Sequence, residues 1–446
     1  MDTNGMTTWA GNHTYTGTVA RPTTLDEAAD VVARARKVRA VGSRHSFNDI
    51  VDSEGLLVSL DALAYRHPAL HLHDSDAPDP GEPASGARRG PEPELDDATG
   101  RVRVSAATRY ADLVLFLQER GRALPNLASL PHIGIAGALA TATHGSGVRN
   151  PVLASAATGL ELLTADGATH RLDRDADGEA LDGATVSLGA LGLVTAVTLQ
   201  TVPAFDVAQT VYGPVPVGDA LDGFDEASDL AYSVSLFTTL REDVFDTVWL
   251  KQAVEPGREP AAPAQVLGAP PLGAKAHPIP GVDPENCTDQ LGVPGPAGDR
   301  LPHFHAEHLP SAGAEIQCEY LVPRENARAA LTALAGLREP LAGLVQVCEV
   351  RSVAADTAWL SPMHRQDCVG VHFTLVRDVA RVTAVLPVID AAFAPLGGRP
   401  HWGKVFRTDP ARLRSLYPRR SDALELARSY DPAEKFINDF LRRWVV

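Results

Sequence analysis

The segment from residue 124 to residue 150 constrains the fold of this chain more than any other part of the sequence. It reads LPNLASLPHIGIAGALATATHGSGVRN, and its only Asp, Glu, Lys or Arg is Arg149. Segments this poor in charge lie inside proteins, and small residues such as Gly and Ala let a backbone approach a neighbouring surface closely. The sequence therefore predicts a backbone that lies against a large ligand.

Two further glycine-containing segments occur in the first 200 residues. Residues 42–48, GSRHSFN, follow a predicted helix and a short predicted strand, and residues 189–195, GALGLVT, lead into a predicted strand at 194–199. Neither is a GxGxxG turn after a strand or a GxxxxGK(S/T) loop, which excludes Rossmann and P-loop binding by motif. Alone, His45 is most simply a capping or solvent-facing residue. Three such segments together predict backbone amides around a large anionic cofactor.

The order of predicted elements indicates an α+β protein with two domains. A capping box at 24–27 starts a predicted helix that ends near Lys37, and residues 161–172 are typical of a hairpin. The predicted organisation is a first domain at 1–200, a flexible acidic Pro/Gly-rich insertion within it at 66–100, a sheet-based domain at 201–400, and a C-terminal segment at 401–446.

Charge and cysteine content exclude several classes of partner. The 40 Lys and Arg against 56 Asp and Glu give a formal net charge of −16, which argues against binding nucleic acid. Four widely spaced cysteines form no CxxC pair, so we expect isolated thiols. The first residues lack the basic region and the apolar region of a signal peptide. The sequence also contains no run of about 18 apolar residues, which a membrane span would need. We expect a cytoplasmic monomer that does not bind membranes.

Two predicted strands of the second domain place polar residues on one face. The strand period of two puts Glu349 and Arg351 on the same face of residues 345–351, and His372 and Thr374 on the same face of residues 369–376. A same-strand ion pair accounts for the first pair as well as a binding site does, and a core histidine accounts for His372. Lys404, in RPHWGK, is either a solvated lysine or a partly buried functional one.

Other catalytic and metal motifs are missing from the sequence. HExxH, the GxSxG nucleophile elbow and CxxC do not occur. His303 and His305 in PHFHAEH have the residue type of metal ligands, but a polar loop is the simpler interpretation. We therefore predict no metal site.

Motifs along nearly the whole chain resemble those of one flavoprotein family. These are TTWAGNHTY, VGSRHSFN, ALPNLASLPHIGIAGALATATHGSG, SLGALGLVT, AYSVSLFT, the region from His277 to Phe304, EYLVPRE, CEVRSVAAD, HFT, RPHWGKVF and DPAEKFINDF. They are similar to the flavoprotein oxidases of the vanillyl-alcohol oxidase family, and among these to the alditol oxidases. The departures are the acidic insertion and Arg44, where the family pattern leads us to expect glycine.

The resemblance implies a fold and a set of cofactor residues. The fold is α+β, a two-part FAD-binding domain of the vanillyl-alcohol oxidase (PCMH) type, completed by the C-terminal segment, and a sheet-based substrate-binding domain. It implies FAD linked through its 8α-methyl to the imidazole of His45. The remaining implied cofactor residues are Val41, Gly42, Ser43, Arg44, Ser46, Phe47, Ser129, Gly134, Gly137, Thr141, Ala142, Thr143, His144, Gly192 and Val194.

The resemblance also implies a reaction, in which the terminal C1 hydroxyl of a polyol such as xylitol or sorbitol is oxidised to the aldose. The hydride passes to flavin N5, and O₂ is reduced to hydrogen peroxide. The implied substrate-binding residues are Ser129, Glu349, Arg351, Thr374 and Lys404, and the implied catalytic residues are Lys404, Arg351, Glu349 and His372.

Three alternatives remain open from the sequence. A sugar-1,4-lactone oxidase of the same family shares the histidyl turn, the Glu-x-Arg strand and the HWxK motif. A polyol dehydrogenase would use the same site with another electron acceptor. A flavin-binding paralogue without activity would have lost the polar strand faces, which this sequence keeps.

Overall fold

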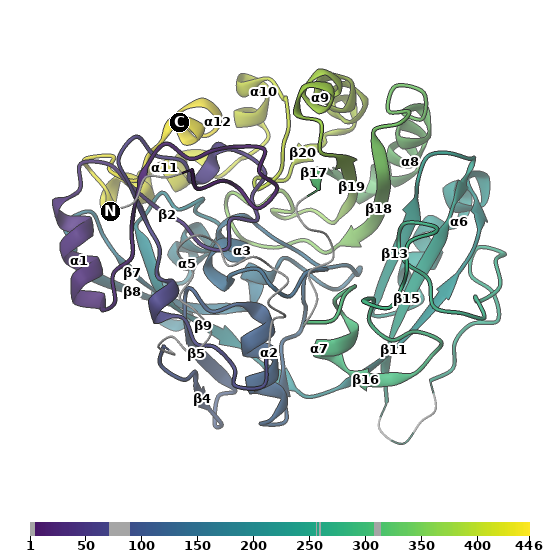
Figure 1. Ribbon diagram of the computed structural model, residues 1–446, viewed down its shortest axis with the longest axis horizontal. Helices are drawn as coiled ribbons and strands as arrows, with labels where there is room; N and C mark the ends of the chain where they lie inside the picture. Colours follow the sequence, from purple (N-terminus) through teal and green to yellow (C-terminus); the bar gives the residue numbers. More distant parts are fainter. Residues whose placement is uncertain (1–4, 71–89, 256, 258–259, 307–313) are drawn as a thin grey trace.

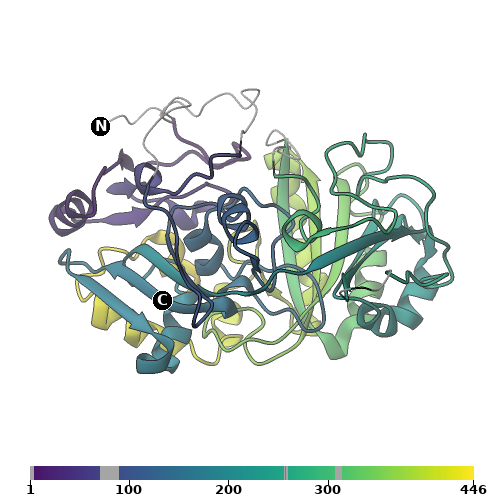
Figure 2. The ribbon, with the colours of Figure 1, turned by 90° about the horizontal axis from the view of Figure 1, so that it is seen from below.

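The chain folds into two parts that face each other, with the C-terminal segment returning to the first part (Figures 1 and 2). The computed structural model describes residues 5–70, 90–255, 257, 260–306 and 314–446. The α+β class and the two-part organisation of the first 200 residues agree with the prediction.

A small parallel sheet begins the first part. It consists of β1 (Thr18–Ala20), β3 (Leu56–Val58) and β2 (Val38–Ala40) in that order, and α1 (Leu25–Arg34) connects β1 to β2. Thr24 caps α1 by accepting a hydrogen bond from the Glu27 amide, as predicted, while the Glu27 carboxylate accepts from the amide of Thr23. The helix ends at Arg34 rather than near Lys37.

An antiparallel five-stranded sheet forms the other half of the first part. Its order is β4 (Glu94–Asp96), β5 (Arg101–Ser105), β9 (Leu193–Gln200), β7 (Ala157–Leu163) and β8 (Thr169–Asp173). The predicted hairpin is β7 and β8, and Gly167 in its turn has a φ of 84°. The helices of this part are α2 (Tyr110–Gln118), α3 (Ile135–Ala140), α4 (Arg174–Asp177) and α5 (Glu179–Thr185), and a short pairing joins β6 (Arg122–Ala123) to β10 (Val202–Pro203).

The predicted flexible insertion at 66–100 is wrong at both of its ends. Residues 94–96 form β4, because Glu94 and Asp96 lie across from Arg103 and Arg101 and the opposite charges suit this pairing. His67 is buried, and its amide donates to the Asp112 carboxylate at 2.7 Å. Residues 71–89 lie outside the described residues.

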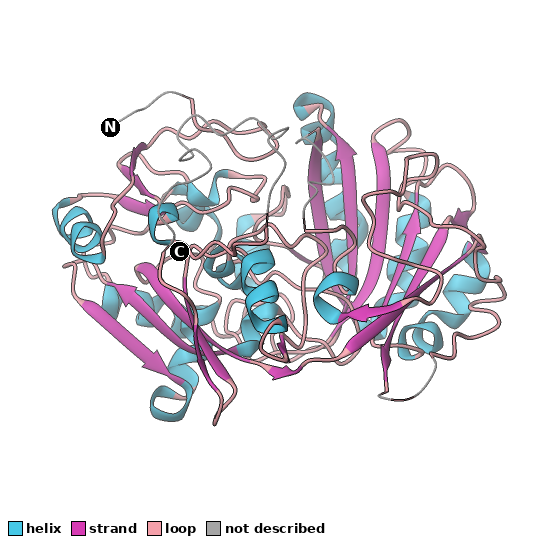
Figure 3. Ribbon diagram, turned by 60° about the horizontal axis from the view of Figure 1, so that its bottom comes forward, coloured by secondary structure: helices cyan, strands magenta, loops and turns pink. Residues whose placement is uncertain are grey.

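One eight-stranded sheet organises the second part. Its order is β16 (Pro294–Pro296), β11 (Asp206–Tyr212), β15 (Thr247–Val254), β13 (Ser233–Thr238), β18 (Val345–Val353), β19 (Cys368–Val376), β17 (Glu315–Pro323) and β20 (Arg399–Pro400). Helices α6 (Val217–Asp229), α8 (Ala327–Gly336) and α9 (Val379–Phe393) pack against its strands (Figure 3). The remaining elements here are β12 (Val215–Pro216), β14 (Val244–Phe245) and α7 (Ala297–Arg300). The four cysteines are buried and unpaired, as predicted.

The sequence predicted no membrane span, but helix α9 with the turn that follows it is a candidate for one. Residues Val379–Leu396 have a mean hydropathy of 1.6 over 18 residues and meet a length and composition criterion for a membrane span. A single helix of this kind does not establish a membrane span, and 22% of this window is buried within the structure. Here Asp390 accepts a hydrogen bond from the Tyr320 hydroxyl on β17 at 3.0 Å, which ties the helix to the large sheet.

The C-terminal segment packs against the N-terminal part (Figure 1). It contains α10 (Pro410–Ser415), α11 (Arg420–Tyr430) and α12 (Asp439–Trp444). The buried Arg39 guanidinium donates to the carbonyls of Ile50, Leu188, Gly189 and Phe436, and so joins three distant segments of the chain. The amide of Val38 also donates to the carbonyl of Lys435 at 3.0 Å.

Candidate active site

A single cavity of about 2090 Å³ holds nearly all the predicted site residues. Small-molecule pockets usually measure roughly 300–1000 Å³, so this cavity has room for a large cofactor together with a substrate. Both parts of the molecule line it. From the first part come Val41, Gly42, Ser43, Arg44, His45, Ser46, Phe47, Ser129, Gly134, Gly137, Thr141, Thr143, His144, Gly192 and Val194. From the second part and the C-terminal segment come Glu349, Arg351, His372, Thr374 and Lys404.

Ala142 is the exception among the predicted cofactor residues. It is fully buried in the core, and it is absent from the described lining of the cavity. Its φ of 57° turns the chain after α3, so that Thr141 and Thr143 on either side of it line the cavity instead. The family resemblance placed Ala142 among the cofactor residues by its position in the motif, which carries no information about the backbone turn at this residue.

The turn at 42–47 presents its backbone to the cavity. A Cβ built on Gly42 meets no atom within 4 Å, so the space in front of this backbone belongs to the cavity. Arg44 has a φ of 59°, a left-handed conformation that costs an ordinary residue energy and glycine none. This explains why glycine was expected there. The Arg44 carbonyl accepts from the amide of Trp9 at 2.9 Å, which holds the turn in place.

His45 lies in this turn beside Trp9, and both side chains are half-buried in the cavity wall. The two rings stack with centroids 5.0 Å apart. Desolvation in the cavity wall, with smaller contributions from the nearby His132, Arg109 and Arg44, lowers the pKa of His45 to about 3. The imidazole is therefore neutral at physiological pH and keeps a nitrogen lone pair that could react with an electrophile.

The second glycine segment packs against the first. Ser43 Oγ accepts from the amide of Gly134, the residue before α3, at 3.0 Å. A Cβ on Gly137 meets nothing within 4 Å, as at Gly42. At Gly192 a Cβ would lie 2.4 Å from the carbonyl oxygen of Leu163, so there glycine is needed for close backbone packing. The cavity thus has a wall of bare backbone, which fits a large flat ligand.

Glu319 on β17 is the centre of the polar cluster at the other end of the cavity. In the large sheet it lies across from His372 on β19, which in turn lies across from Glu349 on β18. Its carboxylate is 2.6 Å from Lys404 Nζ and 3.2 Å from the Arg351 guanidinium, and 3.3 Å from Nε2 of His144. Burial alone would raise the pKa of Glu319, but Lys404 and Arg351 hold it well below its usual range.

Lys404, His372 and Thr374 form a chain of hydrogen bonds. Lys404 Nζ lies 2.6 Å from Nδ1 of His372, and Nε2 of His372 lies 3.2 Å from the Thr374 hydroxyl. Burial, with a smaller contribution from the Lys404 ammonium, lowers the pKa of His372 to about 4. A neutral His372 accepts from the ammonium at Nδ1 and donates from Nε2 to the hydroxyl. The core-histidine interpretation is thus replaced by a histidine in the cavity wall.

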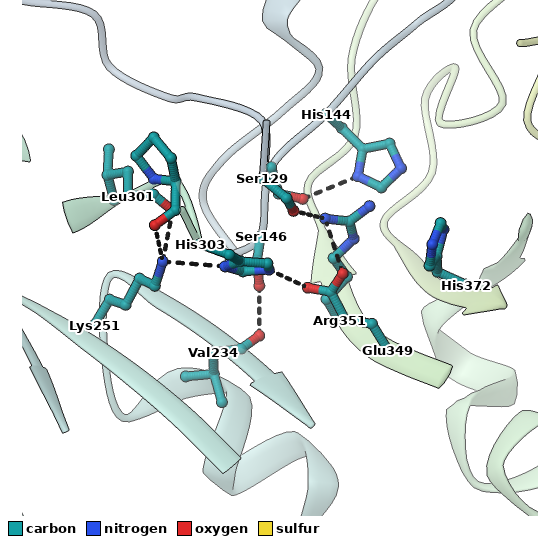
Figure 4. Close-up of polar contacts among 12 residues, drawn as sticks. Ser129, His144, Ser146, Val234, Lys251, Leu301, His303, Glu349, Arg351 and His372 are labelled. Carbon is teal, nitrogen blue, oxygen red and sulfur yellow. Dashed lines mark hydrogen bonds and ion pairs between the residues drawn. The ribbon is translucent and has the colours of Figure 1, made fainter. Parts of the chain in front are cut away.

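Arg351, Ser129 and Glu349 form the neighbouring group (Figure 4). Arg351 donates to the Ser129 hydroxyl at 3.1 Å and lies 3.4 Å from Glu349 Oε2. The other Glu349 oxygen lies 3.1 Å from Nε2 of His303. Glu349 and Arg351 therefore form an ion pair and also line the cavity. The same-strand ion pair and the binding site, which the sequence left as alternatives, are compatible.

Three buried side chains, His144, Glu319 and His401, place their ligand atoms within 4.8 Å of one another. This is the spacing of a metal site. However, Glu319 already balances the charges of Lys404 and Arg351, which would repel a further cation. We interpret the cluster as part of the hydrogen-bonded cavity wall.

Sequence reasoning missed Glu319, Trp9 and the role of His303. For Glu319 a signal existed, because Glu315, Gln317 and Glu319 alternate with Ile316, Cys318 and Tyr320 along the strand, and the first three line the cavity. His303 stood in a motif that was interpreted as a polar loop. The contact of Trp9 with His45 crosses a loop and has no local signature.

Comparison with protein families supports a flavoprotein. Residues 93–173 match the model of an FAD binding domain, and residues 314–444 match the model described as D-arabinono-1,4-lactone oxidase. Among solved structures, a cholesterol oxidase from B. sterolicum aligns with a TM-score of 0.74 at 13% identity, over 99% of this chain and 96% of that one. A solvent-stable cholesterol oxidase aligns with a TM-score of 0.72 at 15% identity, over 100% and 98% of the two chains. These structures establish the shared fold.

Sequence relatives establish the family. The chain is 46% identical to an alditol oxidase of a Streptomyces species over 98% of both chains. It is 30% identical to an L-gulono-1,4-lactone dehydrogenase of Mycobacterium tuberculosis, and 25% identical to an L-gulonolactone oxidase of Bos taurus, over 95% of this chain in each case and 95% and 94% of those relatives. The chain therefore belongs to the FAD-dependent oxidoreductases of the vanillyl-alcohol oxidase family, in the branch that contains alditol oxidase.

Proposed function

We propose that this protein is an oxidase of alditols that converts the terminal C1 hydroxyl of a xylitol- or sorbitol-like polyol to the aldose and reduces O₂ to hydrogen peroxide. The observation that carries the proposal is the position of two cations, the partly buried Lys404 and the buried Arg351, with hydroxyl and carboxylate groups around them, in the same cavity as the glycine segments. Identity to a named alditol oxidase over the whole length supports the choice of substrate class.

The residues around the cavity fit FAD. The bare backbone at Gly42 and Gly137 leaves room for a flat ligand, and the turn at 42–47 offers backbone amides near a phosphate group. When bound, FAD accepts a hydride from the substrate carbon and passes the electrons to O₂.

We further propose a covalent link between FAD and His45. A neutral imidazole that faces the cavity and that Trp9 holds by stacking has a free lone pair and little freedom to turn, and both properties favour bond formation. Such a link would keep the cofactor in place during purification in denaturant.

Lys404 is suited to stabilise negative charge on the reacting oxygen. Its ammonium group has three N–H donors, of which Glu319 and His372 accept one each at 2.6 Å. The third is available to the C1 oxygen as its proton leaves, because Lys404 lines the cavity. A fixed donor in a buried site stabilises a developing alkoxide more strongly than water does.

Ser129, Thr374 and Glu349 are suited to select a polyol. Each presents hydrogen-bonding atoms to the cavity, and their positions are fixed by Arg351, His372 and His303 respectively. A substrate without the matching hydroxyl would leave these buried groups unpaired, which costs about 1–3 kcal/mol for each group. This cost favours polyols over simple alcohols.

Two alternatives differ in substrate or electron acceptor. A sugar-1,4-lactone oxidase would use the same cluster, and a dehydrogenase would reduce an acceptor other than O₂, as the name of the Mycobacterium tuberculosis relative implies for that protein. Higher identity to the alditol oxidase favours the first proposal. The monomeric state and the cytoplasmic location remain predictions.

The visible absorption spectrum of the purified protein tests the proposal. Anaerobic addition of xylitol or sorbitol should bleach the oxidised flavin, and admission of air should restore its colour with formation of hydrogen peroxide. Bleaching by L-gulono-1,4-lactone but not by polyols would support the lactone alternative. Bleaching by polyols without recovery in air would support the dehydrogenase.

A further inference from the structure

Lys251 is a buried lysine that the proposed chemistry does not use. It lies on β15, it is 1% exposed, and it is absent from the described lining of the cavity. Its Nζ atom lies 2.6 Å from the carbonyl oxygen of Leu301, 2.9 Å from that of Pro302 and 3.3 Å from Nδ1 of His303 (Figure 4). A buried ammonium group costs energy unless its donors are satisfied. Here three donors meet three acceptors.

This arrangement determines where the proton of His303 lies. Burial lowers the pKa of His303 to about 4, so the ring is neutral and carries one proton. Burial lowers the pKa of Lys251 to about 7, while the nearby Glu349 carboxylate favours its charged form, so below pH 7 the side chain is an ammonium. An ammonium can only donate, so Nδ1 must then accept and Nε2 must carry the proton. Nε2 lies 3.1 Å from Oε1 of Glu349, and it therefore donates to that carboxylate.

The consequence reaches the substrate pocket through Glu349. Its two carboxylate oxygens are held from opposite directions, one by His303 and the other by Arg351. The other tautomer would point the Nε2 lone pair at a carboxylate oxygen, and the two would repel each other. The amide of His303 also donates to the carbonyl of Ser129 at 3.0 Å, so the ring is anchored beside the pocket.

We propose that Lys251 is a positioning residue for substrate binding. By donating to Nδ1 of His303 it keeps the proton on Nε2, and that N–H holds the Glu349 carboxylate in the orientation that meets the substrate hydroxyls. This inference rests on the proposed function, because it takes Glu349 to be a substrate ligand. Lys251 acts through His303 and contacts no substrate itself.

A double-mutant cycle in the full-length holoenzyme tests the relay from Lys251 to Glu349. The variants are Lys251→Met, His303→Phe and the double variant, with KM and kcat measured for xylitol at about pH 6, where Lys251 is charged. Phe suits position 303 because Phe237 and Trp249 already pack against that ring. Each single variant should raise KM about fivefold, the effect of one misdirected hydrogen bond, with a smaller change in kcat. The double variant should match His303→Phe within about twofold.

Lys275→Met is the matched control. This lysine also donates to a backbone carbonyl, that of Glu285 at 3.4 Å, but it lies outside the cavity lining. Its loss should leave KM and flavin content unchanged. An unchanged KM in Lys251→Met overturns the proposal, and so does a double variant whose effect is the product of the two single effects, because Lys251 would then act independently of His303.

A second measurement does not depend on the folding of Lys251→Met. In the wild-type holoenzyme with ¹⁵N-labelled histidine at about pH 6, where Lys251 is charged and His303 is neutral, the His303 ring should be protonated at Nε2 alone, with the resonance assigned by its absence from His303→Phe. Protonation at Nδ1 overturns the proposal. A wild-type protein that fails to oxidise any alditol refutes the proposed function instead, so the two failures are distinguishable.

Discussion

Replacing Lys404 with methionine should stop the chemistry while leaving the cofactor in place. The substitution removes the ammonium that lies 2.6 Å from both Glu319 and His372, and with it the third donor, which faces the cavity. Residue 404 is attached to the residue after the turn through its own backbone, since the side-chain amide of Asn48 donates to the carbonyl of Lys404 at 2.7 Å. A methionine side chain leaves that bond intact.

Loss of one fixed donor at a developing oxyanion lowers a rate constant about 100- to 1000-fold in enzymes. Glu319 keeps its contact with Arg351 at 3.2 Å, so the remaining carboxylate is still paired and the fold should survive. We therefore expect the rate constant for flavin reduction to fall by about this factor, with flavin content equal to that of the wild type.

The assay is anaerobic stopped-flow mixing with saturating xylitol, followed by the loss of oxidised flavin absorbance. Lys275→Met serves as the control for removal of a lysine elsewhere in the second part. A slowing of less than about fivefold would show that Lys404 does not stabilise charge on the reacting oxygen. Loss of flavin would show that its role is structural.

Three further predictions concern other residues of the cavity wall. His45→Ala should release flavin on acid precipitation, whereas flavin that stays with the pellet would contradict the proposed link. Glu319→Gln leaves two cations with less compensation, and we expect its free energy of unfolding in urea to fall by roughly 3–5 kcal/mol; a loss below about 1 kcal/mol would contradict the assigned role. Burial lowers the pKa values of His303 and His372 to about 4, so between pH 6.5 and pH 4 the unfolded chain binds protons that the folded chain does not. The free energy of unfolding should therefore fall as the pH falls through that window, by about 1.4 kcal/mol per pH unit for each histidine, and a melting temperature that is constant over it would refute this.

Local patterns predicted the strands that carry the site. The period of two correctly placed Glu349 with Arg351 and His372 with Thr374, because alternation along one strand is a local property. The absence of charge in residues 124–150 likewise predicted a backbone against a cavity. These features depend on residues that are neighbours in the sequence.

The missing parts depend on register and long-range pairing. Glu319 becomes the centre of the cluster only because β17 pairs with β19 and places it across from His372. Lys251 and His303 are 52 residues apart and meet through side chains. No local pattern encodes such contacts. The errors at 66–100 arose because a polar composition was taken as evidence of disorder, whereas cross-strand charge pairs stabilise β4.

The contacts of Arg39 and Val38 with residues 435–436 bear on what a shortened chain could form. The turn that bears His45 lies near one end of the described residues, whereas the backbone carbonyls that secure the neighbouring strand and the lysine at the far end of the cavity lie near the other. The first part alone cannot form the complete pocket. A fragment that stops before residue 401 would therefore lack both a wall of the cavity and the contacts that hold the strand leading to His45.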